Sequence, residues 1–190
     1  PTLARTPSAP TITTATTAAA GPASAGRQIP ATSIPANSTS SMAITPANQD
    51  WYRQHFAAVF SDFYLFKKLL GLDPALIESQ AEGWLKTLRI QHKVTIRDGE
   101  YSTINLSQGQ RKRLALVTAM LEDRPFYVFD EWAADQDPTF RRIFYTELLP
   151  DLKRLGKTII VISHDDRYFD VADQLVRMQA GRVISEKAFA

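Results

Sequence analysis

The chain has 190 residues, no cysteine and a formal net charge of +2, with Lys and Arg residues interleaved with acidic ones. This composition excludes a disulfide framework and a thiolate metal site, and it provides no broad basic field for nucleic acid. The longest apolar runs fall well short of the roughly 20 residues that a membrane-spanning helix requires. We therefore expect no nucleic-acid partner and no membrane span within this chain.

Residues 1–50 differ in composition from the rest. They contain no aromatic residue and only three charged ones, Arg5, Arg27 and Asp50. Such a segment has too little apolar surface to offset the entropy cost of ordering its backbone, so we expect it to be disordered. The folded part is expected to begin at Trp51. Because the chain starts with proline and has no signal-peptide pattern, we also expect it to be a fragment.

The first folded elements are predicted by apolar patterns and turn residues. The aromatic stretch 51–66, broken at Ser61, predicts a short buried strand that leads into a loop. Residues 73–88 predict an amphipathic helix with an aspartate N-cap and a proline at its first position. Residues 93–106 contain an Asp-Gly pair between two β-prone runs, which predicts a hairpin.

The second half of the chain predicts alternating helices and strands. Ser107 begins a predicted helix that extends to about residue 121, and its side chain forms a capping box with Gln110. The apolar run 126–130 predicts a strand buried on both faces of a parallel sheet. A helix over 138–156, kinked at Pro150, a strand over 157–166 and two short strands over 172–186 follow. This order indicates an α/β fold.

The start of the helix at Ser107 is a candidate anion site. A helix N-terminus has unpaired amides and about half a unit of positive charge, and Gly109 lets a phosphate approach the backbone closely. An ordinary capping box explains the S-x-x-Q pattern by itself. Two later features favour the anion site. Asp130 and Glu131 end one strand, where they could hold magnesium and polarise an attacking water, and His164 follows the next strand.

Four segments resemble, in chain order, the signature loop, the Walker B strand with its catalytic glutamate, the D-loop and the switch-histidine segment of ABC-transporter ATPase domains: LSQGQ (106–110), FYVFDE (126–131), ADQD (134–137) and SHDD (163–166). The resemblance extends from about Trp51 to the end of the chain. More narrowly, residues 130–169, with Trp132 after the glutamate, resemble bacterial exporters of cyclic peptides and siderophore peptides, of the pyoverdine and microcin types. Plain packing is the alternative role for Trp132.

This resemblance implies a truncated P-loop NTPase-like domain that closes, as a dimer with a second copy, on two ATP molecules with Mg²⁺. It assigns the following roles: Ser107, Gln108, Gly109 and Gln110 cap the γ-phosphate bound by the other copy, Asp130 positions magnesium, Glu131 acts on water, His164 contacts the γ-phosphate and Asp137 links the two sites. It also implies a mostly helical subdomain over about 51–106, followed by the signature helix and the Walker B and switch-histidine core over 107–190.

Two residues depart from the family pattern. Gln108 replaces the first glycine of the signature loop, which adds a side chain near the phosphate but keeps the amide donors. Ser61 occupies the position of the Q-loop glutamine, and its shorter hydroxyl would reach magnesium or water only through an intermediary.

A P-loop is absent from the sequence. It requires G-x-x-x-x-G-K-[ST] between a strand and a helix, because successive amides and the lysine cradle the phosphates. The sequence GKT occurs once, at 156–158, where Asp151 replaces the first glycine and a strand follows. We hypothesise that residues 1–50 are a translated wrong frame, or follow a wrongly assigned gene start, in place of the nucleotide-binding core. The alternative is a genuine flexible linker or an O-glycosylated stalk.

Two surface features remain. The cations at 111–113 are expected to form a solvated helix face. Phe63, Tyr64, Phe66 and Lys67 are a candidate docking surface for a transmembrane domain, although core packing explains the two phenylalanines as well.

Three hypotheses for function follow. The first is the ATP-hydrolysing portion of a bacterial exporter of cyclic or siderophore peptides. It would be attached to the cytoplasmic face of the inner membrane through a transmembrane domain that this chain lacks and that would bind the peptide. Without a P-loop, the isolated chain is expected to hydrolyse ATP poorly. The alternatives are a soluble ABC-type ATPase of DNA repair or chromosome organisation, and a non-catalytic fragment.

Overall fold

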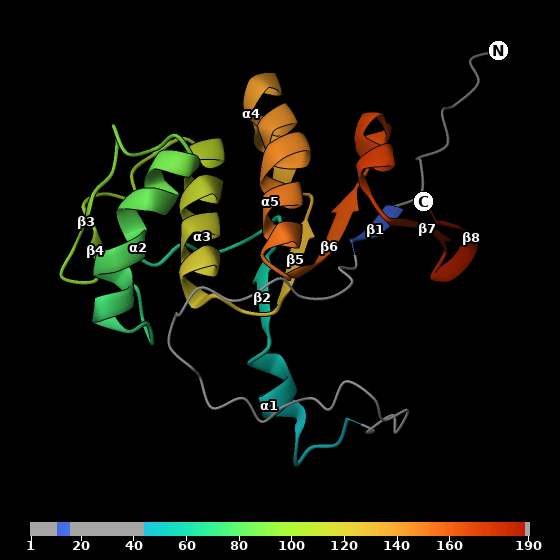
Figure 1. Ribbon diagram of the computed structural model, residues 1–190, viewed down its shortest axis with the longest axis horizontal. Helices are drawn as coiled ribbons and strands as arrows, with labels where there is room; N and C mark the ends of the chain where they lie inside the picture. Colours follow the sequence, from blue (N-terminus) through green and yellow to red (C-terminus); the bar gives the residue numbers. More distant parts are fainter. Residues whose placement is uncertain (1–10, 16–43, 189–190) are drawn as a thin grey trace.

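The computed structural model describes residues 11–15 and 44–188 (Figure 1). A six-stranded sheet has the order β2-β5-β6-β1-β7-β8, and β3 and β4 form a separate pair. The strands are β1 (Thr11–Ala15), β2 (Phe56–Val59), β3 (Ile96–Arg97), β4 (Glu100–Tyr101), β5 (Phe126–Asp130), β6 (Thr158–Ser163), β7 (Gln174–Gln179) and β8 (Arg182–Ala188).

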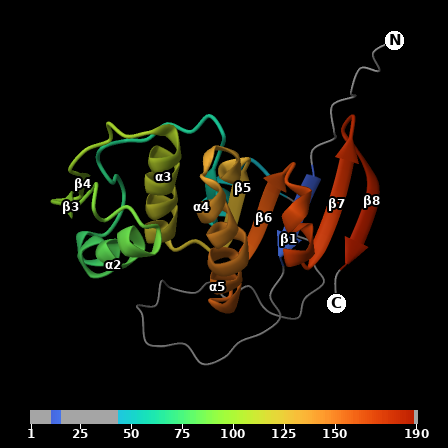
Figure 2. The ribbon, with the colours of Figure 1, turned by 90° about the horizontal axis from the view of Figure 1, so that it is seen from above.

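The helical elements connect these strands and cover the sheet. The α-helices are α1 (Gln49–Arg53), α2 (Pro74–Thr87), α3 (Gln108–Glu122), α4 (Pro138–Ile143) and α5 (Leu149–Arg154). Two 3₁₀ segments, Trp132–Asp135 and Asp166–Val171, and one π-helical segment, Phe144–Leu148, complete the described secondary structure. Figure 2 shows α2, β3 and β4 at one end of the molecule and β7 and β8 at the other.

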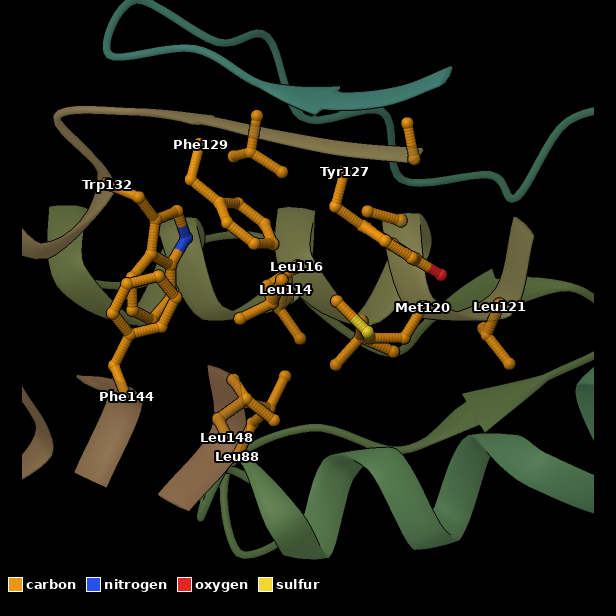
Figure 3. Close-up of a cluster of buried hydrophobic side chains, with 14 of the residues drawn as sticks. Leu88, Leu114, Leu116, Met120, Leu121, Tyr127, Phe129, Trp132, Phe144 and Leu148 are labelled. Atoms are coloured by element: carbon orange, nitrogen blue, oxygen red, sulfur yellow. The ribbon is translucent and has the colours of Figure 1, made fainter. Parts of the chain in front are cut away.

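The core lies on one face of the parallel strands β2, β5 and β6. In register across these strands, Val59 lies beside Phe129 and Phe129 beside Val161, and all three side chains are buried. The side chains of Tyr127 and Phe129 point from β5 toward α3, where they meet Leu114, Leu116 and Met120 (Figure 3). Burial of this continuous apolar layer is the main driving force that holds the helices against the sheet.

The opposite face of β5 is only half-buried, so the prediction of a strand buried on both faces is wrong. Phe126, Val128 and Asp130 are of intermediate exposure, and they alternate with the buried Tyr127 and Phe129. Alternating burial of this kind is expected when one face of a sheet is covered and the other is open.

The segment β1 corrects the expectation that residues 1–50 lack ordered structure. Residues Thr11–Ala15 form a strand that pairs antiparallel with both β6 and β7. The strand β1 therefore lies between β6 and β7. Without it, neither strand would have a hydrogen-bonded neighbour on the side that faces the other. Residues 1–10 and 16–43 of this tract lie outside the described residues, so the expectation for them stays a prediction.

The local predictions for α2 and the hairpins are confirmed. The Asp73 carboxylate accepts a hydrogen bond from the Ala75 amide at 3.0 Å, and Pro74 is the first residue of α2. Asp98 and Gly99 both have positive φ, as a two-residue type I′ turn requires. A similar turn, with Gly181 at φ 74°, joins β7 to β8.

Two predicted elements differ in extent. The aromatic stretch 51–66 contains the expected strand, β2, but residues 51–53 belong to α1. The predicted helix over 138–156 contains the π-helical segment just before Pro150. A wider turn there accommodates a proline that cannot donate a backbone hydrogen bond.

The proposed division of residues 51–190 at residue 107 stays a prediction. Residues 51–106 include β2, which pairs with β5 in the main sheet, and α2 is their one long helix among the described elements. The helix α2 is the longest element in that range, and the expectation of a mostly helical subdomain there stays a prediction. Among the described residues, no helix is long and apolar enough to cross a membrane.

Candidate functional site

The carboxyl ends of β2, β5 and β6 meet at one edge of the sheet. Asp130 at the end of β5 pairs with Ile162 near the end of β6, so Glu131 and His164 follow at the same edge. In open sheets of parallel strands, ligands bind outside this edge. The topology therefore brings together the acids and the histidine that the sequence placed 33 positions apart.

Glu131 and His164 are in direct contact. The Nε2 atom of His164 lies 2.7 Å from Oε1 of Glu131, and both side chains are partly exposed. Glu131 has a left-handed backbone with φ 51° and ψ 26°, which is uncommon for a residue other than glycine. Its amide donates to the Ile162 carbonyl at 3.0 Å, which anchors the turn to β6. This pair can hold and transfer a proton.

Asp130 is a half-buried carboxylate beside this pair. In the described part of the chain, no group of three or more His, Cys, Asp or Glu side chains could hold a metal ion. Magnesium does not need such a cage, because proteins usually hold it through one or two carboxylates together with phosphate oxygens and water. The donor chemistry of Asp130 fits that kind of site.

Glu131 and His164 line a pocket together with charged and hydroxyl groups to which the sequence analysis assigned no role. Arg141 lies 3.5 Å from Asp165 and donates to the main-chain carbonyls of Ala133 and Ala134. Arg167 forms two hydrogen bonds of 2.8 Å with Asp165, and this pairing holds the pKa of that carboxyl below its usual range.

Tyr145 is a further pocket residue that the sequence analysis did not identify. Its hydroxyl lies 2.8 Å from the Ser163 hydroxyl, which also accepts a hydrogen bond from the Asp165 amide. Tyr145 lies on the π-helical segment, and only the tertiary fold brings it to the end of β6. Its position could not be found from spacing along the chain.

The predicted capping box is confirmed. The Ser107 hydroxyl accepts a hydrogen bond from the Gln110 amide at 3.4 Å, and the Ser107 amide donates to the Gln110 side chain at 3.3 Å. Ser107 is exposed and Gln110 is half-buried. The N-terminus of α3 therefore opens to the surface, with its hydroxyl partly engaged in the cap.

The side chain of Gln108 does not extend freely from the loop. Its Nε2 atom donates to Oδ2 of Asp135 at 3.1 Å. Gly109 lies against the same segment, because a Cβ atom there would be 2.8 Å from the Asp135 carbonyl oxygen. The close approach that Gly109 permits in this structure is therefore to the backbone of residues 132–137.

Lys112 corrects the expectation that residues 111–113 form a solvated face. Its side chain is only 1% exposed, and its Nζ atom lies 2.7 Å from Asp135 and 3.2 Å from the Glu131 carbonyl oxygen. Arg113 is also largely covered, and it contacts Asp137 at 2.6 Å. The two cations face the acidic segment rather than the solvent.

Asp137 is the N-cap of α4. Its carboxylate accepts a hydrogen bond from the Phe140 amide at 2.9 Å. This bond, together with Arg113, lowers the pKa of Asp137 below its ordinary value. Asp137 therefore has a structural role within one copy, whatever it contributes between two copies.

The surroundings of Ser61 and of the GKT sequence bear on two further assignments made from the sequence. Ser61 lies in an exposed turn two residues beyond β2, and in the described part of the chain no hydrogen bond joins it to another predicted site residue. The GKT sequence is confirmed not to be a P-loop. Gly156 follows α5 with φ 78°, Lys157 pairs with Asp123, and Thr158 begins a strand.

Trp132, which follows the catalytic glutamate of the family pattern, is a buried side chain. Trp132 is 1% exposed and stacks on Phe144, with ring centroids 4.4 Å apart (Figure 3). The packing role proposed for Trp132 is therefore confirmed.

Tyr64 and Phe66 are largely exposed, whereas Phe63 is half-buried against the core. Core packing thus accounts for Phe63 but not for Phe66.

This fold, with an acidic pair and a histidine at the carboxyl edge of parallel strands, belongs to the α/β class of P-loop NTPase-like ATPase domains. More particularly, the chain belongs to the ABC transporter family, whose model, described as "ABC transporter", matches residues 24–134. The matched range begins inside the compositionally distinct tract 1–50, so part of that tract aligns with the family.

Individual relatives and structures agree with this assignment. The chain is 54% identical over 147 residues to "ATP-binding protein SyrD" of Pseudomonas syringae pv. syringae, covering 76% of this chain and 26% of SyrD. It is 34% identical over 127 residues to "Energy-coupling factor transporter ATP-binding protein EcfA1" of Thermotoga maritima, covering 67% of this chain and 47% of EcfA1. The chain thus spans less than half the length of these relatives.

The fold is also similar to that of a solved structure, "Dimeric structure of a post-hydrolysis state of the ATP-binding cassette MJ0796 bound to ADP and Pi". The TM-score is 0.62 at 20% sequence identity, with 76% of this chain and 68% of that chain covered. At this level of identity the likeness establishes the fold.

Proposed function

We propose that this chain is the part of an ATP-hydrolysing ABC exporter that carries the signature loop, the catalytic carboxylate and the switch histidine. The observation that carries the proposal is the 2.7 Å contact between Glu131 and His164 at the carboxyl edge of the parallel strands. An imidazole in contact with a carboxylate fixes its orientation, and a carboxylate so oriented can accept a proton from a water molecule that attacks a phosphate.

The residues of the site divide the work of phosphoryl transfer. Glu131 would orient the attacking water and take its proton, while His164 would fix the Glu131 carboxylate through its Nε2 atom and contact the γ-phosphate. Asp130 would hold Mg²⁺, which would supply positive charge to neutralise the phosphate oxygens. Positioning and electrostatic stabilisation account for most of the catalysis in this reaction class.

The Ser107 turn supplies the second half of the site in a dimer of two copies. The N-terminus of α3 is open to the surface, so its amides and dipole can face an anion on another molecule. Because the chain has no P-loop, the phosphates must be held by a P-loop segment outside its sequence. The chain alone is therefore expected to bind and hydrolyse ATP weakly.

The exporter assignment, for cyclic or siderophore peptides, rests on the sequence. It is supported by Trp132 after the catalytic glutamate and by the 54% identity to SyrD. A transmembrane domain of the exporter would bind the peptide and would hold the ATPase at the cytoplasmic face of the bacterial inner membrane. The exposed Tyr64 and Phe66 provide apolar surface for docking to that domain.

A chimera tests this function. Residues 1–50 are replaced by the P-loop-bearing segment of an ABC cassette such as that of SyrD, and ATP turnover is measured. We expect turnover that Glu131→Gln reduces by about 100-fold or more, since a positioned base contributes roughly 10²–10⁴-fold. Glu122→Gln, at the far end of α3, is the matched control and is expected to retain activity. A folded chimera without turnover would support the non-catalytic fragment instead.

A further inference from the structure

Lys112 is a buried cation whose position no sequence motif explains. Its side chain lies inside the molecule between α3 and the 3₁₀ segment Trp132–Asp135, where it is 1% exposed. Burying an ammonium group is costly unless the charge is paired and its protons are bonded. Lys112 meets both conditions, with the Asp135 carboxylate at 2.7 Å and the Glu131 carbonyl oxygen at 3.2 Å.

The contact with Glu131 acts on the backbone of the catalytic residue. Glu131 has a left-handed conformation that surrounding bonds must maintain. Its amide is held by the Ile162 carbonyl, and its carbonyl oxygen is held by the Ala134 amide and by Lys112. The Lys112 ammonium thus fixes one side of the peptide from which the Glu131 side chain extends toward His164.

The contact with Asp135 acts on the signature loop. Asp135 forms an ion pair with Lys112 and accepts a hydrogen bond from Gln108, so one carboxylate joins the two side chains. The Gln136 side chain, which is buried, donates to the Gly109 carbonyl oxygen at 3.1 Å. These bonds tie the first turn of α3 to the segment that follows the catalytic glutamate.

We propose that Lys112 is a positioning residue that orients Glu131 toward His164 through the Glu131 main chain, and that Lys112 and Asp135 together hold the Gln108 side chain away from the signature-loop amides. This arrangement compensates for glutamine at position 108, where the family pattern has glycine. The Gln108 side-chain amide is bonded to Asp135 instead of lying over the N-terminus of α3. The proposal rests on the proposed function for the reaction that Glu131 serves.

The test uses the full chain and reads the Glu131 contact without nucleotide. The histidines are labelled with ¹⁵N, and the ring resonances of His164 are recorded at one fixed pH, with His55 and His92 as internal references. Glu131→Ala, which removes the carboxylate and leaves no acceptor in its place, gives the shift that corresponds to a lost contact. Lys112→Met, which keeps the length of the side chain but removes its charge and its donors, is expected to move the His164 resonances in the same direction and by most of that shift.

Two variants separate positioning from a general loss of structure. Lys157→Met removes an ion pair of the same length, 2.7 Å to Asp123, at the other end of α3 and is expected to leave His164 unchanged. Lys112→Gln keeps a hydrogen-bond donor and is expected to restore part of the His164 signal. His164 resonances that stay at their original positions in a folded Lys112→Met protein would overturn the proposal.

Asp135→Asn covers the case in which Lys112→Met fails to fold. Asp135 is 39% exposed, so this variant is tolerable, and loss of the carboxylate is expected to shift His164 in the same direction. Unchanged resonances in Asp135→Asn would then overturn the proposal. A folded chimera without ATP turnover would contradict the proposed function but would not change the His164 resonances of the full chain. Failure of the proposed function and failure of the Lys112 proposal are therefore distinguishable.

Discussion

Replacement of Trp132 by alanine is expected to destabilise the protein strongly. The indole is 1% exposed and stacks on Phe144 at 4.4 Å, with Phe140 at 6.0 Å. Its Nε1 atom donates to the Lys112 carbonyl at 3.1 Å. The side chain therefore joins the segment after Glu131 to both α3 and the helical segment that follows α4.

The size of the effect follows from this burial. Truncation of a buried tryptophan to alanine costs about 3–5 kcal/mol. Trp132→Phe keeps an aromatic ring for the stack but removes the indole donor and part of the volume, so about 1–2 kcal/mol is expected. For a domain of this size, 1 kcal/mol lowers Tm by about 2–4 °C, so the alanine variant should melt about 6–20 °C lower.

The assay is urea unfolding followed by far-ultraviolet circular dichroism, because tryptophan fluorescence itself changes in the variants. Leu155→Ala, at an apolar side chain that is 64% exposed, is the control and is expected to stay within about 0.5 kcal/mol of the parent. A free-energy loss under about 1 kcal/mol for Trp132→Ala would refute the packing described for this residue.

The remaining predictions concern the backbone and one carboxylate. Thr13→Pro removes a hydrogen bond from β1, which is paired on both sides, so it should lower the urea midpoint relative to Thr13→Val; equal midpoints would show that β1 does not pair. Gly109→Ala should cost about 1–3 kcal/mol, because its Cβ would lie 2.8 Å from a carbonyl oxygen. Gly83→Ala, with nothing within 4 Å in α2, should gain about 0.5–1 kcal/mol. If Gly109→Ala and Gly83→Ala have the same unfolding free energy, the close approach of Gly109 to the Asp135 carbonyl oxygen is wrong. The pKa of Asp137 is lowered by the Phe140 amide, so its stabilisation is present above the unfolded-state pKa and is lost as pH falls through the folded-state pKa. Asp137→Asn should therefore flatten the loss of stability below about pH 4 in acid titrations, and an unchanged acid limb would contradict this.

Local signals in the sequence predict much of the fold. Asp73, Pro74 and Ser107 are capping residues whose chemistry acts within one turn, so the helices that they begin could be placed from the sequence. The acids at the end of β5 and the histidine after β6 could also be placed together, because parallel strands end at a common edge.

Long-range packing accounts for what the sequence analysis missed. Lys112 precedes the buried Leu116 by four residues, so helical spacing places it on the inward face, but its charge argued for solvent. Residues 11–14 form a β-prone run within a tract whose overall composition argued for disorder. Arg141 reaches the pocket through its bonds to the main chain of residues 133–136, and Tyr145 through its hydroxyl contact with Ser163 of β6.

ATP-dependent dimerisation of the chimera measures most directly whether the Ser107 turn faces a triphosphate on a second copy. Glu131→Gln is used to prevent hydrolysis, and Ser107 is changed to Asn or to Asp, which cap a helix equally well and differ in charge. Sedimentation in the presence of Mg²⁺ and ATP should show a dimer for the Asn variant and a monomer for the Asp variant, because the added carboxylate repels the phosphate. Equal dimerisation of the two variants would contradict a nucleotide shared between two copies.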